Sequence, residues 1–206
     1  MKVKNAINVA AVCALGVLSV AVPAVQAEVS ASVAAANMYY FRGVDMGGGA
    51  AISADVNYSA SGFTVGVWTT SGDEALGTEY DIYAGYAGEA GDFTYGGGFI
   101  SYNYPEVSQE PGEYTEAYLS AGYAGLELTY YKAITGGEYT YTTLAYSYDK
   151  FTVLYGLHED DSSHLDLTYS YNDNLSFTVG QVLEENDNSY FPNADTKFVV
   201  TLSLPL

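Results

Sequence analysis

Apolar and polar residues alternate with a period of two along most of the chain from residue 29 to the C-terminus. Side chains of a β-strand point to opposite faces in turn, so this alternation predicts strands that are apolar on one face only. No stretch of the sequence keeps the 3.6-residue period of an amphipathic helix. We count twelve strand-like segments. The clearest apolar sets are Phe63, Val65 and Val67; Leu126, Leu128 and Tyr130; Phe151, Val153, Tyr155 and Leu157; Leu165, Leu167, Tyr169 and Tyr171; and Phe198, Val200, Leu202 and Leu204.

The connections between these segments alternate between longer and shorter ones. An up-and-down barrel has short turns at one end and longer loops at the other, whereas a sandwich with Greek-key crossovers has no reason to alternate in this way. We therefore predict an all-β fold, an antiparallel up-and-down β-barrel. With a first strand over about 29–42, the longer connections, acidic and rich in Gly, lie at about 43–49, 72–77, 105–112, 134–137, 159–163 and 185–195. The shorter ones lie at about 59–62, 87–92, 124–125, 149–150 and 172–174.

Strand length and the placement of aromatic residues predict that this barrel spans a membrane. Segments of about 10 residues, at about 3.3 Å each and tilted near 45°, rise about 23 Å, close to the apolar band of a transmembrane barrel. Tyr precedes the short turns, and an aromatic residue or Leu opens the next strand, so these side chains would form a ring where bilayer meets water. The alternative is that Tyr simply favours strands. The expected ring consists of Tyr58, Phe63, Tyr86, Phe93, Tyr123, Tyr148, Phe151 and Tyr171.

The N-terminal segment predicts export from the cytoplasm. Lys2 and Lys4 precede an apolar run over 6–22, and small residues lead up to Ala27. This pattern is typical of a signal peptide, residues 1–27, cleaved after Ala27 to leave 28–206 as one barrel domain. The single cysteine, Cys13, lies in the signal peptide, so we expect neither a disulfide nor a lipid-anchor cysteine afterwards. Export and barrel together predict the outer membrane of a Gram-negative bacterium, with its lipid and the barrel-assembly machinery as partners.

The charge balance limits the partners of the exported chain. Residues 28–206 carry all 25 acidic residues but only four bases, Arg42, Lys132, Lys150 and Lys197, which gives a formal net charge of −21. So acidic a chain repels nucleic acid, and we expect none as a partner. No cofactor motif is present in the sequence, and the Gly-rich runs 47–49 and 96–98 do not fit phosphate loops.

Parity along the strands predicts an acidic barrel interior. Near the middle of a membrane a charge is costly unless it meets water or a partner, so charges on the non-lipid face imply a wet lumen and cation-favouring permeation, or else internal salt bridges in a narrow barrel. Arg42 ends the first predicted strand and Lys197 begins the last, so closure would make them neighbours. They would form a basic patch across the mouth or hold the closure seam by pairing with acids. The acidic lumen candidates are Asp55, Glu79, Asp81, Glu116, Glu127 and Asp166.

Histidine, carboxylates and serine converge in the segment 158–164. Such a set suits a divalent-metal site or a hydrolase at the barrel rim, with His164 as base. However, the spacing matches no specific metal motif and no Gly-flanked nucleophile is present. The alternative is a solvated acidic loop. We therefore expect no metal site, no catalytic residue and no enzymatic activity, and keep a hydrolase around His158 and His164 as a minor alternative.

Short aromatic and Gly-containing segments give the chain a resemblance to a known family. In order and spacing they are similar to the TorF-like family of outer-membrane porins over most of residues 28–206, and they comprise 40–44, 61–63, 66–68, 78–86 and 102–105. The resemblance implies a channel-like barrel but brings no substrate and no functional residues. We expect a passive channel for small hydrophilic solutes with a preference for cations. The alternative is a structural or adhesive barrel whose lumen is filled.

Overall fold

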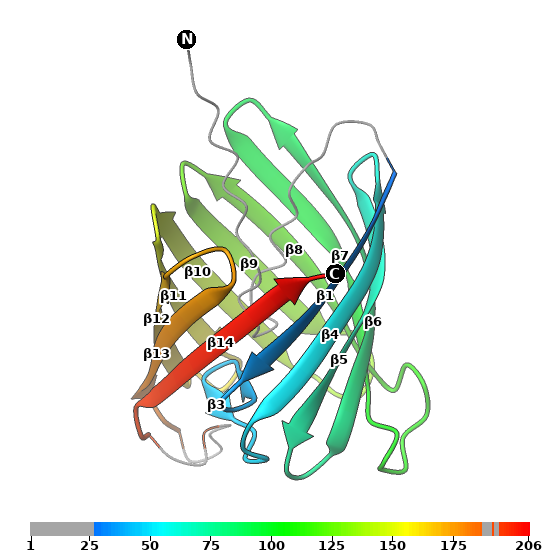
Figure 1. Ribbon diagram of the computed structural model, residues 1–206, viewed down its shortest axis with the longest axis vertical. Coiled ribbons are helices and arrows are strands. Elements are labelled where there is room, and N and C mark those ends of the chain that lie inside the picture. The colour runs from blue at the N-terminus through cyan, green and yellow to red at the C-terminus, as the bar shows by residue number, and fades with distance from the viewer. Residues whose placement is uncertain (1–26, 187–190, 192–193) are drawn as a thin grey trace.

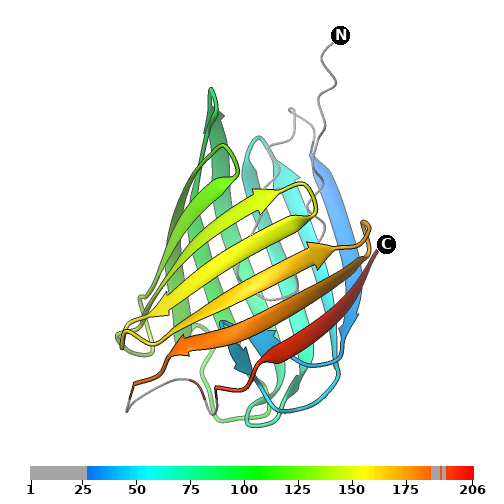
Figure 2. The ribbon, with the colours of Figure 1, turned by 90° about the vertical axis from the view of Figure 1, so that its left-hand side faces the viewer.

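The protein forms a closed barrel of 12 antiparallel strands, shown by a computed structural model that describes residues 27–186, 191 and 194–206 (Figures 1 and 2). The predicted fold class is therefore confirmed. The signal peptide predicted over 1–27 lies outside the described residues except for Ala27. The barrel strands are β1 (Glu28–Ala36), β4 (Ala51–Ala60), β5 (Phe63–Asp73), β6 (Gly77–Ala90), β7 (Phe93–Asn103), β8 (Tyr114–Tyr123), β9 (Leu126–Ala133), β10 (Thr140–Tyr148), β11 (Phe151–His158), β12 (Ser163–Ser170), β13 (Leu175–Glu184) and β14 (Lys197–Pro205).

Each strand pairs with its neighbours along the chain, and β1 closes the ring against β14. The register gives every strand one inward and one outward row of side chains. Large apolar side chains occupy the outward rows and stay exposed, for example Phe63 at 64% and Leu119 at 69%. The described residues include no helix long and apolar enough to cross a membrane.

The two ends of the barrel differ in their connections, as the alternation predicted. One end, the short-turn end, carries the connections 61–62, 91–92, 124–125, 149–150 and 171–174. Both residues of the turns Ser61-Gly62 and Ala124-Gly125 have positive φ, as in the type I′ turns that match the twist of a hairpin. The opposite end, the loop end, carries the connections 37–50, 74–76, 104–113, 134–139, 159–162 and 185–196.

The predicted first strand, 29–42, is wrong at its C-terminal end, because β1 stops at Ala36. The next residue, Asn37, ends the pairing with β14: its side-chain amide donates to the carbonyl of Phe198 at 2.9 Å, and its Oδ1 accepts from the backbone N–H of Val200 at 2.7 Å. The side chain thus takes the place of backbone partners. The chain then leaves the wall, and the alternation at 40–45 belongs to a separate small hairpin.

This hairpin consists of β2 (Tyr40–Phe41) and β3 (Val44–Asp45), which pair only with each other. Its turn is Arg42-Gly43, with φ of 48° and 87°, so Arg42 lies at the tip. The hairpin lies within the outline of the barrel near the loop end, as the views in Figures 1 and 2 agree. The first long connection therefore folds inward and does not extend outward as a loop.

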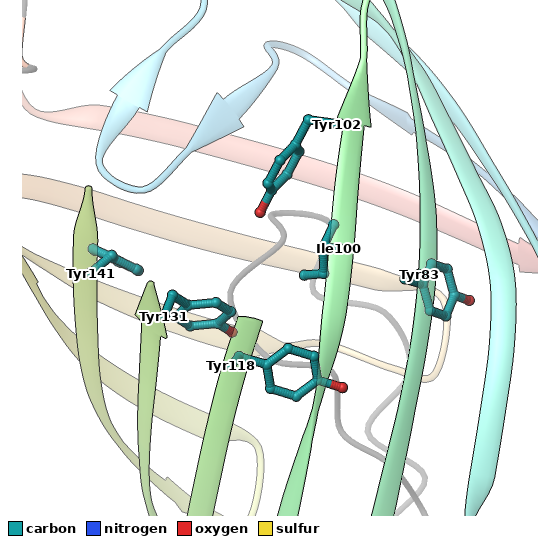
Figure 3. Close-up of a cluster of buried hydrophobic side chains, with 6 residues drawn as sticks. All are labelled: Tyr83, Ile100, Tyr102, Tyr118, Tyr131 and Tyr141. Atoms are coloured by element: carbon teal, nitrogen blue, oxygen red, sulfur yellow. The ribbon is translucent and has the colours of Figure 1, made fainter. Parts of the chain in front are cut away.

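The aromatic core lies inside the barrel, toward the loop end. Inward-facing side chains from β6 to β10 form it and project from the wall as Figure 3 shows. The wall makes room for these rings with glycines: a Cβ on Gly85 or Gly98 would collide with the phenol of Tyr118. The cluster consists of Tyr83, Ile100, Tyr102, Tyr118, Tyr131 and Tyr141.

Candidate functional site

The inward hairpin is fixed to opposite walls of the barrel by two tyrosines. The Tyr39 phenol donates a hydrogen bond of 2.7 Å to Glu79 on β6, and the Tyr40 phenol donates one of 2.6 Å to Asp166 on β12. Burial and the nearby Glu79 carboxylate raise the pKa of the Tyr39 phenol well above its ordinary value, so this group stays protonated and acts as donor. Gly180 on β13 provides the space that the Tyr40 ring needs, because a Cβ there would collide with its hydroxyl.

Arg42 at the hairpin tip is the central cation of the interior. It is only 5% exposed, and its Nη1 and Nη2 donate to the two oxygens of Glu116 on β8 at 2.9 and 2.6 Å. A planar guanidinium suits such bidentate pairing and also stacks on aromatic faces. Here the guanidinium carbon lies 4.5 to 5.4 Å from the ring centroids of Phe41, Tyr131, Tyr139 and Tyr141. The partner and the aromatic rings together allow the charge to be buried.

The two histidines are buried inside the barrel, so the reading of 158–164 as a solvated loop is wrong for them. His158 and His164 are 4% and 1% exposed, whereas Glu159 and Asp161 between them are exposed. The Nε2 of His158 lies 3.1 Å from the carbonyl oxygen of Arg42, and its Nδ1 lies 2.9 Å from the Tyr139 phenol. These contacts tie the hairpin backbone to β11.

His164 completes a chain of hydrogen bonds along the inner face of the barrel, from β10 through β12 to the hairpin. Its Nε2 lies 2.8 Å from the Tyr141 phenol, and its Nδ1 lies 3.1 Å from Asp166, which also accepts from Tyr40. Tyr141 is itself 1% exposed, so this set of groups offers no nucleophile to solvent. Among the described residues, no three His, Cys, Asp or Glu side chains are arranged to hold a metal ion. The chemistry of the cluster is that of a hydrogen-bonded support.

The register places all six acidic candidates in inward rows. Glu79, Asp81 and Glu116 are at most 6% exposed and lie beside the hairpin. Asp55 is half-buried and accepts from the Tyr83 phenol at 2.7 Å, while Glu127 lies nearer the short-turn end. Asp81 is fully buried, and its carboxyl group shares a hydrogen bond with Glu79, which lies in the same inward row of β6.

The predicted proximity of Arg42 and Lys197 at the closure seam is wrong. Strands β1 and β14 are neighbours, as expected, but Arg42 is not on β1 and reaches Glu116 on the far wall. Lys197 remains at the start of β14, in an inward row opposite Gly180. The error follows from the first strand, since extending it to Arg42 placed the base at the seam.

Aromatic side chains surround the outside of the short-turn end. All eight residues of the expected ring are exposed, from 39% for Tyr86 to 72% for Tyr148. Several pair across neighbouring strands, with ring centroids 4.8 Å apart for Phe63 and Tyr86 and 4.7 Å apart for Phe93 and Tyr123. Between them and the loop end, the outer surface is dominated by exposed apolar side chains such as Val65, Leu119 and Leu128.

Sequence reasoning missed three phenols that bind inward carboxylates: Tyr39 and Tyr40, and Tyr102, which donates to Glu116 at 2.8 Å. One local signal was available: Arg42-Gly43 between two pairs of extended residues fits a two-residue hairpin turn. The partners themselves were not accessible to pattern reasoning, because Arg42 and Glu116 are 74 positions apart.

Comparison with known proteins gives a family but no activity. No curated protein matches the chain. A family model described as a bacterial protein of unknown function, Gcw_chp, matches residues 20–199, which covers nearly all the barrel strands. This match provides no link to the TorF-like porins, so that resemblance stays a prediction. The chain belongs to the bacterial Gcw_chp family, whose function is unknown.

Proposed function

We propose that the chain is exported and inserted into the outer membrane of a Gram-negative bacterium, where it is a passive channel for small hydrophilic solutes and prefers cations. The observation that carries this proposal is the contrast between an exposed apolar exterior and an acidic interior. Outer-membrane lipid, the barrel-assembly machinery and small solutes are then its partners. The resemblance to TorF-like porins agrees with it.

The exterior supports the membrane part of the proposal. Soluble monomers rarely expose contiguous apolar surfaces, whereas the outward rows here are exposed and apolar on strand after strand. A closed sheet also satisfies the backbone requirement of lipid, because it leaves no unpaired edge. The exposed tyrosines at the short-turn end suit the boundary between lipid and water.

The interior supports the cation part. Six acidic side chains face inward against two inward bases, Arg42 and Lys197, so acidic groups outnumber basic ones inside the barrel and favour a negative field there. Rings or walls of acidic side chains favour cations in channels. Asp55 and Glu127 are less buried than the acids at the hairpin, so they are the carboxylates that a passing cation would meet first from the short-turn end.

Planar-bilayer recording of the refolded barrel tests the channel. In a KCl gradient we expect stepwise current, with a reversal potential whose sign shows that K⁺ passes more readily than Cl⁻. The size of this reversal potential should be smaller in Asp55→Asn and in Glu127→Gln. Heat-modifiable migration in gels confirms that the sample is a folded barrel, and N-terminal sequencing of exported protein should begin at Glu28. A preference for anions would contradict the cation-selective channel. An exported protein that begins at a residue other than Glu28 would contradict the predicted cleavage after Ala27.

A barrel with a filled interior, structural or adhesive in function, is the second candidate. The hairpin favours it, since residues 39–48 contact each strand from β5 to β12 through bonds or ring contacts. A folded barrel that passes no current would support this candidate over the channel. We do not propose the rim hydrolase, because His164 and Tyr141 are buried.

A further inference from the structure

The hairpin crosses the barrel interior near the loop end and contacts each strand from β5 to β12. Tyr39 packs against Trp68 on β5, Phe41 against Tyr102 on β7, and Arg42 lies between β8 and β10. On the opposite side, His158 of β11 binds the hairpin backbone and Asp166 of β12 binds Tyr40. A channel through this barrel therefore requires the hairpin to leave its place.

The closed arrangement leaves buried polar atoms without hydrogen bonds at the surface between hairpin and wall. Among the described residues, the Nε of Arg42 at the hairpin tip has no partner, and neither has the Oδ2 of Asp73, the residue that bridges to Gly47. Buried polar groups without partners raise the free energy of the state that contains them. Water reaching these atoms would stabilise a state in which the hairpin has moved.

The connection that follows the hairpin is suited to motion. Gly47 and Gly49 have φ of 87° and 78°, Gly48 lies between them, and residues 47–50 are exposed. Only glycine adopts such conformations without strain. On the other flank, Asn37 is bound to β14 at Phe198 and Val200 and marks a fixed point. Two backbone hydrogen bonds of 2.9 Å, from Gly48 to Gly72 and from Glu74 to Met46, hold the glycine flank to the end of β5, so the segment between the flanks moves only when they break.

From these observations we propose that residues 37–50 form a displaceable plug that closes the barrel at its loop end. The Arg42–Glu116 pair is its latch. Movement about Asn37 and the glycines 47–49 opens the barrel. The role of the plug as a gate rests on the proposed channel function. The movement of the segment can be measured by hydrogen exchange, which requires no ion current.

An isosteric substitution tests the latch. Glu116→Gln weakens it, so we expect at least tenfold faster amide hydrogen exchange in 37–50 and a larger open fraction in bilayer recordings, while exchange of the barrel strands stays unchanged. Glu89→Gln makes the same change of charge at an exposed position near the short-turn end, and both quantities should match the wild type.

A second pair of variants covers the event that Glu116→Gln does not fold. Tyr40→Phe removes only the hydrogen bond to Asp166, and should speed exchange of the hairpin about threefold. Tyr118→Phe removes an interior phenol away from the hairpin and should leave exchange unchanged.

The outcomes separate the plug from the channel. Faster exchange confined to 37–50 in Glu116→Gln or Tyr40→Phe supports the plug, even where no variant passes current, and that combination overturns the channel alone. Hairpin exchange as slow as that of the barrel strands in every variant, or equal acceleration of hairpin and barrel strands, overturns the plug.

Discussion

The two halves of the barrel interior differ in the side chains that fill them. Toward the loop end, large phenols, two histidines and a buried ion pair surround the hairpin. Toward the short-turn end, the inward rows carry small side chains, and hydroxyls pair across strands, as in Ser59 with Thr64, Ser147 with Thr152, and Thr168 with Thr178 at 2.8 to 3.0 Å.

This difference shows how a single strand pattern supports two kinds of interior. Alternation only requires that one row faces inward and the other outward, and both halves satisfy that requirement. The loop half is held by specific long-range partners, so we expect it to be sensitive to substitution. The short-turn half is held mainly by the backbone ladder, and we expect it to be tolerant. The following substitutions test this contrast.

The largest effect is expected from Arg42→Met. It leaves Glu116 buried without its partner, so the free energy of unfolding should fall by about 3–5 kcal/mol. Urea unfolding of the barrel in detergent, followed by heat-modifiable migration, measures this loss. Lys150→Met is the matched control, since its exposed Nζ binds only the carbonyl of Tyr171, and we expect a change below about 0.5 kcal/mol. Equal effects of the two variants would contradict the contrast.

Gly156→Val should destabilise the loop half by overpacking. A Cβ at this position on β11 would collide with His164 and the Tyr141 phenol, so we expect a loss of about 1–3 kcal/mol in the same unfolding measurement. Gly96→Ala, an inward position nearer the short-turn end, meets the movable Ser120 hydroxyl first and should lose less than about 1 kcal/mol. A larger loss for Gly96→Ala would show that the short-turn half is the more tightly packed.

Tyr141→Phe should have a smaller effect. It removes the 2.8 Å hydrogen bond to His164 without changing the volume of the ring, and the buried imidazole loses a partner. We expect the free energy of unfolding to fall by about 1–2 kcal/mol. Chemical denaturation measures it, and an unchanged midpoint would indicate that the His164 chain contributes little.

The smallest effect is expected from Thr168→Val in the short-turn half. The substitution removes the 2.8 Å contact with the Thr178 hydroxyl but preserves the shape of the side chain. Because this row faces the barrel interior, the remaining hydroxyl can turn toward other polar groups, and we expect a loss of about 0.5 kcal/mol. A loss equal to that of Tyr141→Phe would remove the distinction between the halves.

The contrast also explains which features could be predicted from the sequence. The barrel, its 12 strands and the inward placement of the acids follow from alternation, which reports only the face of each residue. The exposed ring at the short turns follows from position relative to a turn. These are local properties, and pattern reasoning reads them directly.

The hairpin could not be predicted in this way, because Tyr40 and Phe41 alternate as a wall strand would. What separates them from β1 is Asn37, whose side chain replaces backbone partners on β14. The burial of the histidines likewise depends on partners far along the chain: His158 meets a carbonyl 116 positions away. Contacts of this kind arise from barrel closure and are not visible in any short stretch.

The seam between β1 and β14 has a consequence for the order of assembly. Its residues are far apart in the chain, since Asn37 and Phe198 are separated by 161 positions. Closing the ring therefore costs loop entropy, and we expect it to follow the formation of the intervening strands. Until then both strands are open edges. The hairpin is joined directly to β1, so the step that removes the two edges also encloses the hairpin. Ring closure and filling of the interior are thereby coupled in one folding event.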